Sequence, residues 1–145
     1  MSSTLVYDAI KARLVDQLGG TYAIRDFEEI ETQLQQATDP WIALEDSGGG
    51  NTLNSVGSPQ SNWVTDDGYI DAHIFVPSTG SLALARTISE QVRDVLLYYQ
   101  MTVTDGYVRS LSVDPPSVGF MHDGLWHNMF VSINYTHQYA RATVA

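Results

Sequence analysis

The stretch Gly68-Tyr69-Ile70-Asp71-Ala72-His73-Ile74-Phe75-Val76 decides the fold, because its side chains alternate with a period of two. Neighbouring side chains of a β-strand point to opposite faces, so this alternation predicts a strand. One face is apolar and suits a buried core: Ile70, Ala72, Ile74 and Val76. The other mixes aromatic and polar groups, which fits a surface covered by a neighbouring protein: Tyr69, Asp71, His73 and Phe75. Pro77 has no N–H to donate and ends the strand.

Two helices are expected to pack on the apolar face of this strand. The first is Thr4–Leu18, whose apolar residues recur every four positions: Val6, Ile10, Leu14 and Leu18. Gly19-Gly20 provides a left-handed stop. The second helix is capped by Ser81 and runs to about Tyr99, with one apolar stripe: Leu84, Ile88, Val92, Val95 and Tyr99.

Further strands are expected at Thr21–Asp26, Trp41–Glu45, Tyr107–Asp114 and Leu125–Tyr139, the last with one apolar face: Met129, Val131, Ile133 and Tyr135. The polar segment Phe27–Ala37 fits a loop or a marginal helix, and His122-Asp123-Gly124 a turn. Strands that follow one another without a helix between them pair antiparallel. Residues 1–145 are therefore predicted to form a single α+β domain, with a mainly antiparallel sheet of about four to five strands and two helices on one face.

Residues 47–67 interrupt this pattern with a composition rich in glycine, serine and asparagine. Structureless loops of this length are uncommon in compact domains and are usually functional or disordered. The composition therefore predicts a flexible loop or arm within the domain. It is either a simple connector or an arm that becomes ordered on a partner.

Length and composition indicate a folded protein without disulfides. The chain has 145 residues, of which 43% are hydrophobic and 17% charged, and it has no cysteine. These values are typical of one globular domain. The N-terminus has no basic segment followed by an apolar run, and no stretch approaches the roughly 18–20 apolar residues of a membrane span. We expect the protein to stay in the cytoplasm of its cell until it joins a larger particle.

The formal net charge of −10 comes from one continuous segment. Between Asp26 and Ala85 there is no Lys or Arg, but ten acids are present: Asp26, Glu28, Glu29, Glu31, Asp39, Glu45, Asp46, Asp66, Asp67 and Asp71. Such a field repels phosphate backbones and disfavours specific binding of nucleic acid. The segment forms either an ordinary solvated surface or an acidic docking or lumen surface.

The residues offer no recognisable catalytic or metal-binding pattern. Asp66, Asp67 and Asp71 lack the ligand spacing of a calcium loop. Four histidines are present (His73, His122, His127 and His137), but the last two are about 33 Å apart in a straight strand. There is no cysteine nucleophile, no Gly-x-Ser-x-Gly elbow and no phosphate-binding loop. Paired carboxylates for glycoside hydrolysis remain compatible with the spacing. We expect no enzyme activity, no cofactor and no metal.

The order of elements carries a family resemblance. An N-terminal helix is followed by a strand starting at Trp41, a gap, the strand Gly68–Val76, and the Ser81-capped helix with Ala85-Arg86 near its start. This order resembles the tail-terminator, or tail-completion, proteins of long-tailed bacteriophages. The closing strand Trp126–Tyr135 is also similar to that family's last strand. The resemblance covers about residues 3–137.

The resemblance implies a structural virion protein and not an enzyme. Such a protein forms a ring, typically a hexamer, that caps the tail tube, ends tube polymerisation and makes the joint to the head. Its implied partners are other copies of itself, the tail tube protein and the head–tail connector or stopper protein. DNA would pass through the lumen without specific binding, and no membrane is involved. The implied location is the head-proximal end of the virion tail, with assembly in the host cytoplasm.

In that family, the sheet and an inserted loop commonly make the contacts between subunits. The resemblance therefore implies a hypothetical interface on the loop and the outward face of the strand, together with three acids. Its residues are Ser47, Gly48, Asn51, Trp63, Asp66, Asp67, Tyr69, Asp71, His73 and Phe75, with Glu28, Glu29 and Glu31. The alternative is an intracellular adaptor or regulatory module that binds one protein through its loop. An enzyme with a pocket between sheet and helix is the third possibility.

Overall fold

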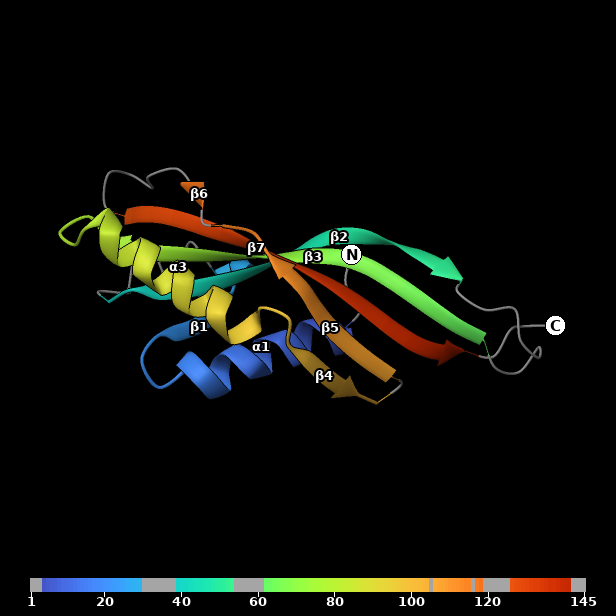
Figure 1. Ribbon diagram of the computed structural model, residues 1–145. Coiled ribbons are helices and arrows are strands. Elements are labelled where there is room, and N and C mark those ends of the chain that lie inside the picture. Colours follow the sequence, from blue (N-terminus) through green and yellow to red (C-terminus); the bar gives the residue numbers. More distant parts are fainter. Residues whose placement is uncertain are drawn as a thin grey trace.

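The computed structural model describes residues 4–29, 39–53, 62–104, 106–115, 117–118 and 126–141, which form an α+β fold (Figure 1). Its helical segments are α1 (Thr4–Leu18), the 3-10 helix η1 (Phe27–Glu29) and α3 (Leu82–Leu96). Its strands are β1 (Ala23–Asp26), β2 (Trp41–Leu53), β3 (Asn62–Pro77), β4 (Gln100–Val103), β5 (Gly106–Val113), β6 (Ser117–Val118) and β7 (Trp126–Arg141).

The two longest strands form the middle of the sheet. β3 and β7 have 16 residues each and pair antiparallel from Asn62 opposite Arg141 to Pro77 opposite Trp126. The strand order is β1-β2-β3-β7-β5-β4, and β6 pairs separately with β7. Figure 1 shows that β2, β3 and β7 continue well beyond the ends of the two helices. The sheet thus has a helix-covered part and a projecting part.

The predicted apolar faces of β3 and α1 are confirmed. All four apolar residues of β3 are fully buried: Ile70, Ala72, Ile74 and Val76. They share one core with the buried α1 residues Val6, Ile10 and Leu14, while Leu18 is partly buried against it. Both helices therefore cover the same face of the sheet. Ser81 is confirmed as the N-cap of α3, because its Oγ accepts a hydrogen bond of 3.2 Å from the N–H of Leu84.

The predicted stripe of α3 was partly wrong. The buried residues are Ala85, Ile88, Ser89, Val92 and Leu96, whereas Leu84 is 38% and Tyr99 37% exposed. Ser89 can enter the core because its hydroxyl donates to the carbonyl of Ala85, at 2.8 Å. A prediction from hydropathy counts Ser89 as polar. It therefore selects the neighbouring face of the helix, which includes Leu84 and Tyr99, as the buried one. The helix also ends at Leu96, before Tyr98 adopts a left-handed φ of 55°.

The predicted sheet of four to five mainly antiparallel strands was incomplete. The sheet is mixed, because β1 and β2 pair parallel, and the described residues contribute seven strands to it. The strand β4 directly follows α3 and begins at Gln100, next to residues predicted to be helical. Such short edge strands are defined by the hydrogen bonds of a neighbour, and four residues carry too little periodicity to reveal them.

Within the segment 47–67, where a loop or arm was predicted, residues 47–53 and 62–67 are strand residues of β2 and β3. β2 runs through the glycines to Leu53, which lies opposite Val64 of β3, with a register shift between Asp46 and Gly49. Glycine has a low strand propensity, but the long β3 offers a continuous row of backbone partners. Residues 54–61 lie outside the described residues, as do the predicted turn at His122–Gly124 and the segment 30–38.

The exposure difference along α3 can be tested by two matched truncations. Ile88→Ala removes a fully buried side chain and should lower the free energy of unfolding by about 2–5 kcal/mol. Leu84→Ala, one turn earlier and exposed, should cost less than about 1 kcal/mol. Chemical denaturation of both variants measures the difference. Equal losses of stability in the two variants would mean that Leu84 is buried in the core, which would contradict this orientation of the helix.

Candidate functional site

The face of the sheet opposite the helices is lined by polar side chains, and we call it the polar face. It carries Asp67, Tyr69, Asp71 and His73 of β3, Glu45 of β2, and Ser132, Asn134 and Thr136 of β7. Tyr69 is 42% exposed there. Four β3 residues of the predicted interface thus share this face: Asp67, Tyr69, Asp71 and His73.

The polar groups of this face are hydrogen-bonded to one another across the strands. Ser132 Oγ donates to Asp71 Oδ1 at 2.6 Å, and Thr136 Oγ1 donates to Asp67 Oδ1 at 2.9 Å. Both bonds join residues that stand directly opposite in the β3–β7 register. Asn134 Nδ2 also donates to Ser112 Oγ, at 3.0 Å. These bonds restrict the side chains, so a partner that binds here finds the surface already ordered.

One end of the polar face is closed by an aromatic cluster. Trp41 stacks on Phe75 with ring centroids 4.4 Å apart, and Trp126 meets Trp41 edge-on at 6.3 Å. Phe75 is fully buried in this cluster, so its side chain is not exposed for a partner as the interface hypothesis assumed. The indole Nε1 of Trp41 is buried and has no hydrogen-bond partner among the described residues. Sequence reasoning missed the cluster because its members come from three strands.

Next to the aromatic cluster, His73 lies beside two carboxylates. Its Nε2 is 2.7 Å from Glu45 Oε2, and Glu45 stands opposite Asp71 in the β2–β3 register. One possible metal-ligand atom from each of these three residues lies within 4.8 Å of the others. Glu45, Asp71 and His73 are thus a group in the described part of the chain that could hold a metal ion. Sequence reasoning considered Asp71 with Asp66 and Asp67, and His73 with the other histidines. Only the strand register brings Glu45 into the group.

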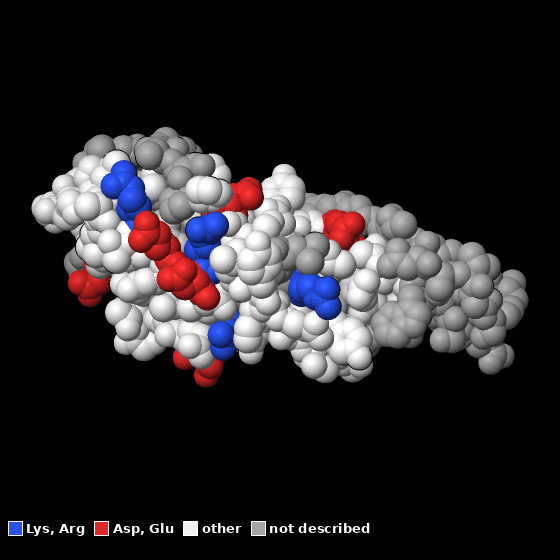
Figure 2. Space-filling view, viewed as in Figure 1, with Lys and Arg blue, Asp and Glu red and all other residues white. Residues whose placement is uncertain are grey.

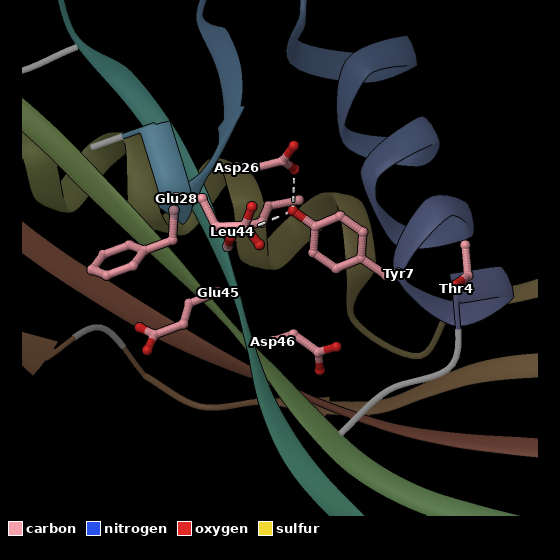
Figure 3. A pocket seen from close by; sticks show the side chains of 8 residues that line it. Thr4, Tyr7, Asp26, Glu28, Leu44, Glu45 and Asp46 are labelled. Atoms are coloured by element: carbon pink, nitrogen blue, oxygen red, sulfur yellow. Dashed lines mark hydrogen bonds between the residues drawn. The ribbon is translucent and has the colours of Figure 1, made fainter. Parts of the chain in front are cut away.

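A second candidate site is an acidic pocket at the β1–β2 edge of the sheet (Figure 3). It has a volume of about 450 Å³ and is lined by Thr4, Tyr7, Asp26, Phe27, Glu28, Leu44, Glu45 and Asp46. In Figure 3, Tyr7 reaches from α1 toward Asp26 and the backbone of Leu44. Four of the eight lining residues are acids, so the pocket favours a cationic group.

Tyr7, Lys11 and Asp26 form a hydrogen-bonded network at the rim of this pocket. The Tyr7 hydroxyl donates to Asp26 Oδ1, and Lys11 Nζ donates to the same oxygen at 2.9 Å. These two bonds hold the pKa of Asp26 below its ordinary value. Burial, and then the bond to Asp26, raise the pKa of the Tyr7 phenol well above its ordinary value. At neutral pH, Asp26 is therefore ionised and Tyr7 keeps its proton.

The remaining predicted interface residues lie in different places. Ser47, Gly48 and Asn51 belong to β2, and Trp63 belongs to β3. Asp66 is half-buried opposite His137, on the helix-covered side of the sheet, while Asp67 next to it lies on the polar face. Glu28 and Glu29 are in η1, and Glu31 lies outside the described residues. The acidic segment thus does not form one continuous patch in the described structure.

The face that carries α3 is not strongly acidic. Figure 2 shows acidic and basic side chains interspersed over this side of the molecule. Four acids instead gather around the edge pocket: Asp26, Glu28, Glu45 and Asp46. Neither described helix is long and apolar enough to cross a bilayer.

Comparison with known proteins gives a likeness in fold. No family model matches the chain, and no curated protein matches it. Among solved structures, it is similar to a chain of the virion of a native gene transfer agent particle, with a TM-score of 0.60 and 14% sequence identity. The likeness covers 95% of this chain and 99% of the other. At this identity it establishes a shared fold over almost the whole length.

The network at the pocket rim predicts a pH-dependent contribution to stability. A carboxylate whose pKa is lowered by folding stabilises the protein fully above its unfolded pKa of about 4, and this stabilisation is lost as the pH falls through the folded value. The Asp26 side chain is 37% exposed, which limits the effect. Asp26→Asn should therefore cost at most about 1 kcal/mol at pH 7, and less below pH 4.

Denaturation of Asp26→Asn and wild type at pH 7 and pH 3 measures this difference. Asp8→Asn, at an exposed position of α1, the helix that carries Tyr7 and Lys11, is the control and should change stability little at either pH. An Asp26→Asn deficit of the same size at both pH values would contradict an electrostatic origin.

Proposed function

We propose that this chain is a structural protein of a phage-like virion and acts by binding other protein subunits. The observation that carries the proposal is the fold likeness to a chain of a gene transfer agent virion over 95% of this chain. The order of sequence elements, which resembles tail-terminator proteins, supports it independently. Because 14% identity establishes a fold and not an activity, assembly has to be tested directly.

Within this proposal, the finer role is that of a tail terminator. Copies of the chain would form a ring, a hexamer by analogy with the tail-terminator proteins, that caps the tail tube and stops its polymerisation. The tube protein would contact one side of the ring and the head–tail connector the other. DNA would pass through the lumen without specific binding, because the acids of the chain, such as the four around the edge pocket, repel a polyanion. The chain would have no enzymatic activity and no cofactor in this role.

Ring closure requires two different surfaces of one chain to be complementary. The polar face is one candidate surface, because its hydrogen-bonded side chains lose little conformational freedom on association. The exposed ring of Tyr69 supplies apolar area at its centre. The outer edge of β2 is the other candidate. β1 pairs with Trp41–Leu44, and no described strand pairs with that edge over residues 47–53.

The role of the polar face in assembly can be tested with two tyrosine variants. Tyr69→Ala should raise the concentration needed for half-maximal self-association at least about tenfold, because a central aromatic residue often dominates an interface. Tyr98→Ala is the matched control, since Tyr98 is 74% exposed at the end of α3 and outside the polar face. Analytical ultracentrifugation over a concentration series measures both.

Electron microscopy of growing tail tubes tests the finer role, because added wild-type protein should shorten the tubes and appear at one end. A chain that stays monomeric at high concentration and leaves tubes unchanged would contradict the tail-terminator proposal. A stoichiometric complex with one cellular protein, never a ring, would instead favour the adaptor alternative.

A further inference from the structure

We propose that Glu45, Asp71 and His73 bind one divalent transition-metal ion of the zinc class on the polar face. This inference does not depend on the proposed function. It rests on three donors from two neighbouring strands whose ligand atoms lie within 4.8 Å of one another.

The spacing of the donors suits an ion held between them. Ligands of a tetrahedral zinc ion are about 2.0–2.2 Å from the metal and so lie roughly 3.3–3.6 Å from one another. His73 Nε2 and Glu45 Oε2 are 2.7 Å apart, as a hydrogen-bonded pair. An ion would replace this hydrogen bond after a small outward movement of Glu45. That side chain is 41% exposed and can make such a movement without disturbing the core.

The other two donors are held in place by their neighbours. Asp71 accepts a hydrogen bond of 2.6 Å from Ser132 Oγ, which fixes the orientation of its carboxylate. The His73 ring packs against Phe27 and Phe130, with centroids 4.7 and 5.8 Å away, and its side chain is only 13% exposed. Outer contacts of this kind orient metal ligands and strengthen binding. The two rings also cover the imidazole, so the His73 side chain has little contact with water.

The donor types select the class of metal. One imidazole nitrogen and two carboxylates suit Zn²⁺ and similar ions, whereas Ca²⁺ and Mg²⁺ prefer shells made of oxygen ligands. Three protein donors leave a coordination position for water. The competing explanation is that His73 and Glu45 form an ordinary ion pair, in which case Zn²⁺ has no specific effect.

The experiment uses the full chain after treatment with a chelator and dialysis. Zn²⁺ titrated by calorimetry should bind saturably with one ion per chain. An excess of Zn²⁺ should raise the melting temperature, because it binds the folded state, and the same concentration of Mg²⁺ should not. His73→Gln, Asp71→Asn and Glu45→Gln should each weaken Zn²⁺ binding at least about tenfold. His127→Gln, a half-buried histidine of β7 outside the group, should bind Zn²⁺ like the wild type.

The absence of saturable Zn²⁺ binding would overturn the proposal, and so would binding that the three variants leave unchanged. A loss of equal size in His127→Gln would overturn it as well, because the binding would then be non-specific. If His73→Gln does not fold, Glu45→Gln decides, since that position is half-exposed. These outcomes leave the self-association measurements unaffected, so the failure of either proposal can be recognised separately.

Discussion

The pairing of β3 with β7 is the constraint on which the rest of the structure depends. Sixteen residues of each strand stay in register from Asn62 opposite Arg141 to Pro77 opposite Trp126. This ladder presents one apolar face to α1 and α3 and one polar face on the other side. The ladder also continues past the ends of the helices (Figure 1). In that projecting part, β2 pairs with β3 through backbone hydrogen bonds, without α1 or α3 covering the sheet. A slip of one residue would exchange the two faces completely.

The polar face follows from this ladder, and together with the edge pocket it offers surface on which a partner can bind. Across the polar face, hydrogen bonds between opposite residues order the surface before any partner arrives. At the edge, Tyr7 and Lys11 of α1 bind Asp26 of β1, which ties the first helix to the first strand and leaves further acids at the pocket rim. An ordered surface with an exposed tyrosine is what a subunit interface needs, and the proposed virion role uses that property.

The aromatic cluster shows how the structure redistributes residues that looked like a surface. Phe75 alternates with buried residues and was assigned to the outward face. It does lie on that face, but Trp41 and Trp126 cover it from the neighbouring strands. The polar face therefore has a closed aromatic end and an open hydrogen-bonded part. His73 lies at the boundary between them, where aromatic packing restrains an imidazole that faces two carboxylates.

The amino-acid sequence by itself determined the features that depend on residues close along the chain. The period of two predicted the faces of β3 and β7, the period of four predicted α1, and Ser81 marked the start of α3. Only the tertiary structure decided which strands are neighbours and in which register. The register of β2 and β3 places Glu45 opposite Asp71 and Trp41 opposite Phe75. It also pairs the glycines after Asp46 with β3, so that they form part of a strand. Residues opposite each other across a sheet can lie tens of positions apart, and no local pattern encodes their pairing. The same reason explains the α3 error, because the buried face of a helix is selected by the sheet on which it packs.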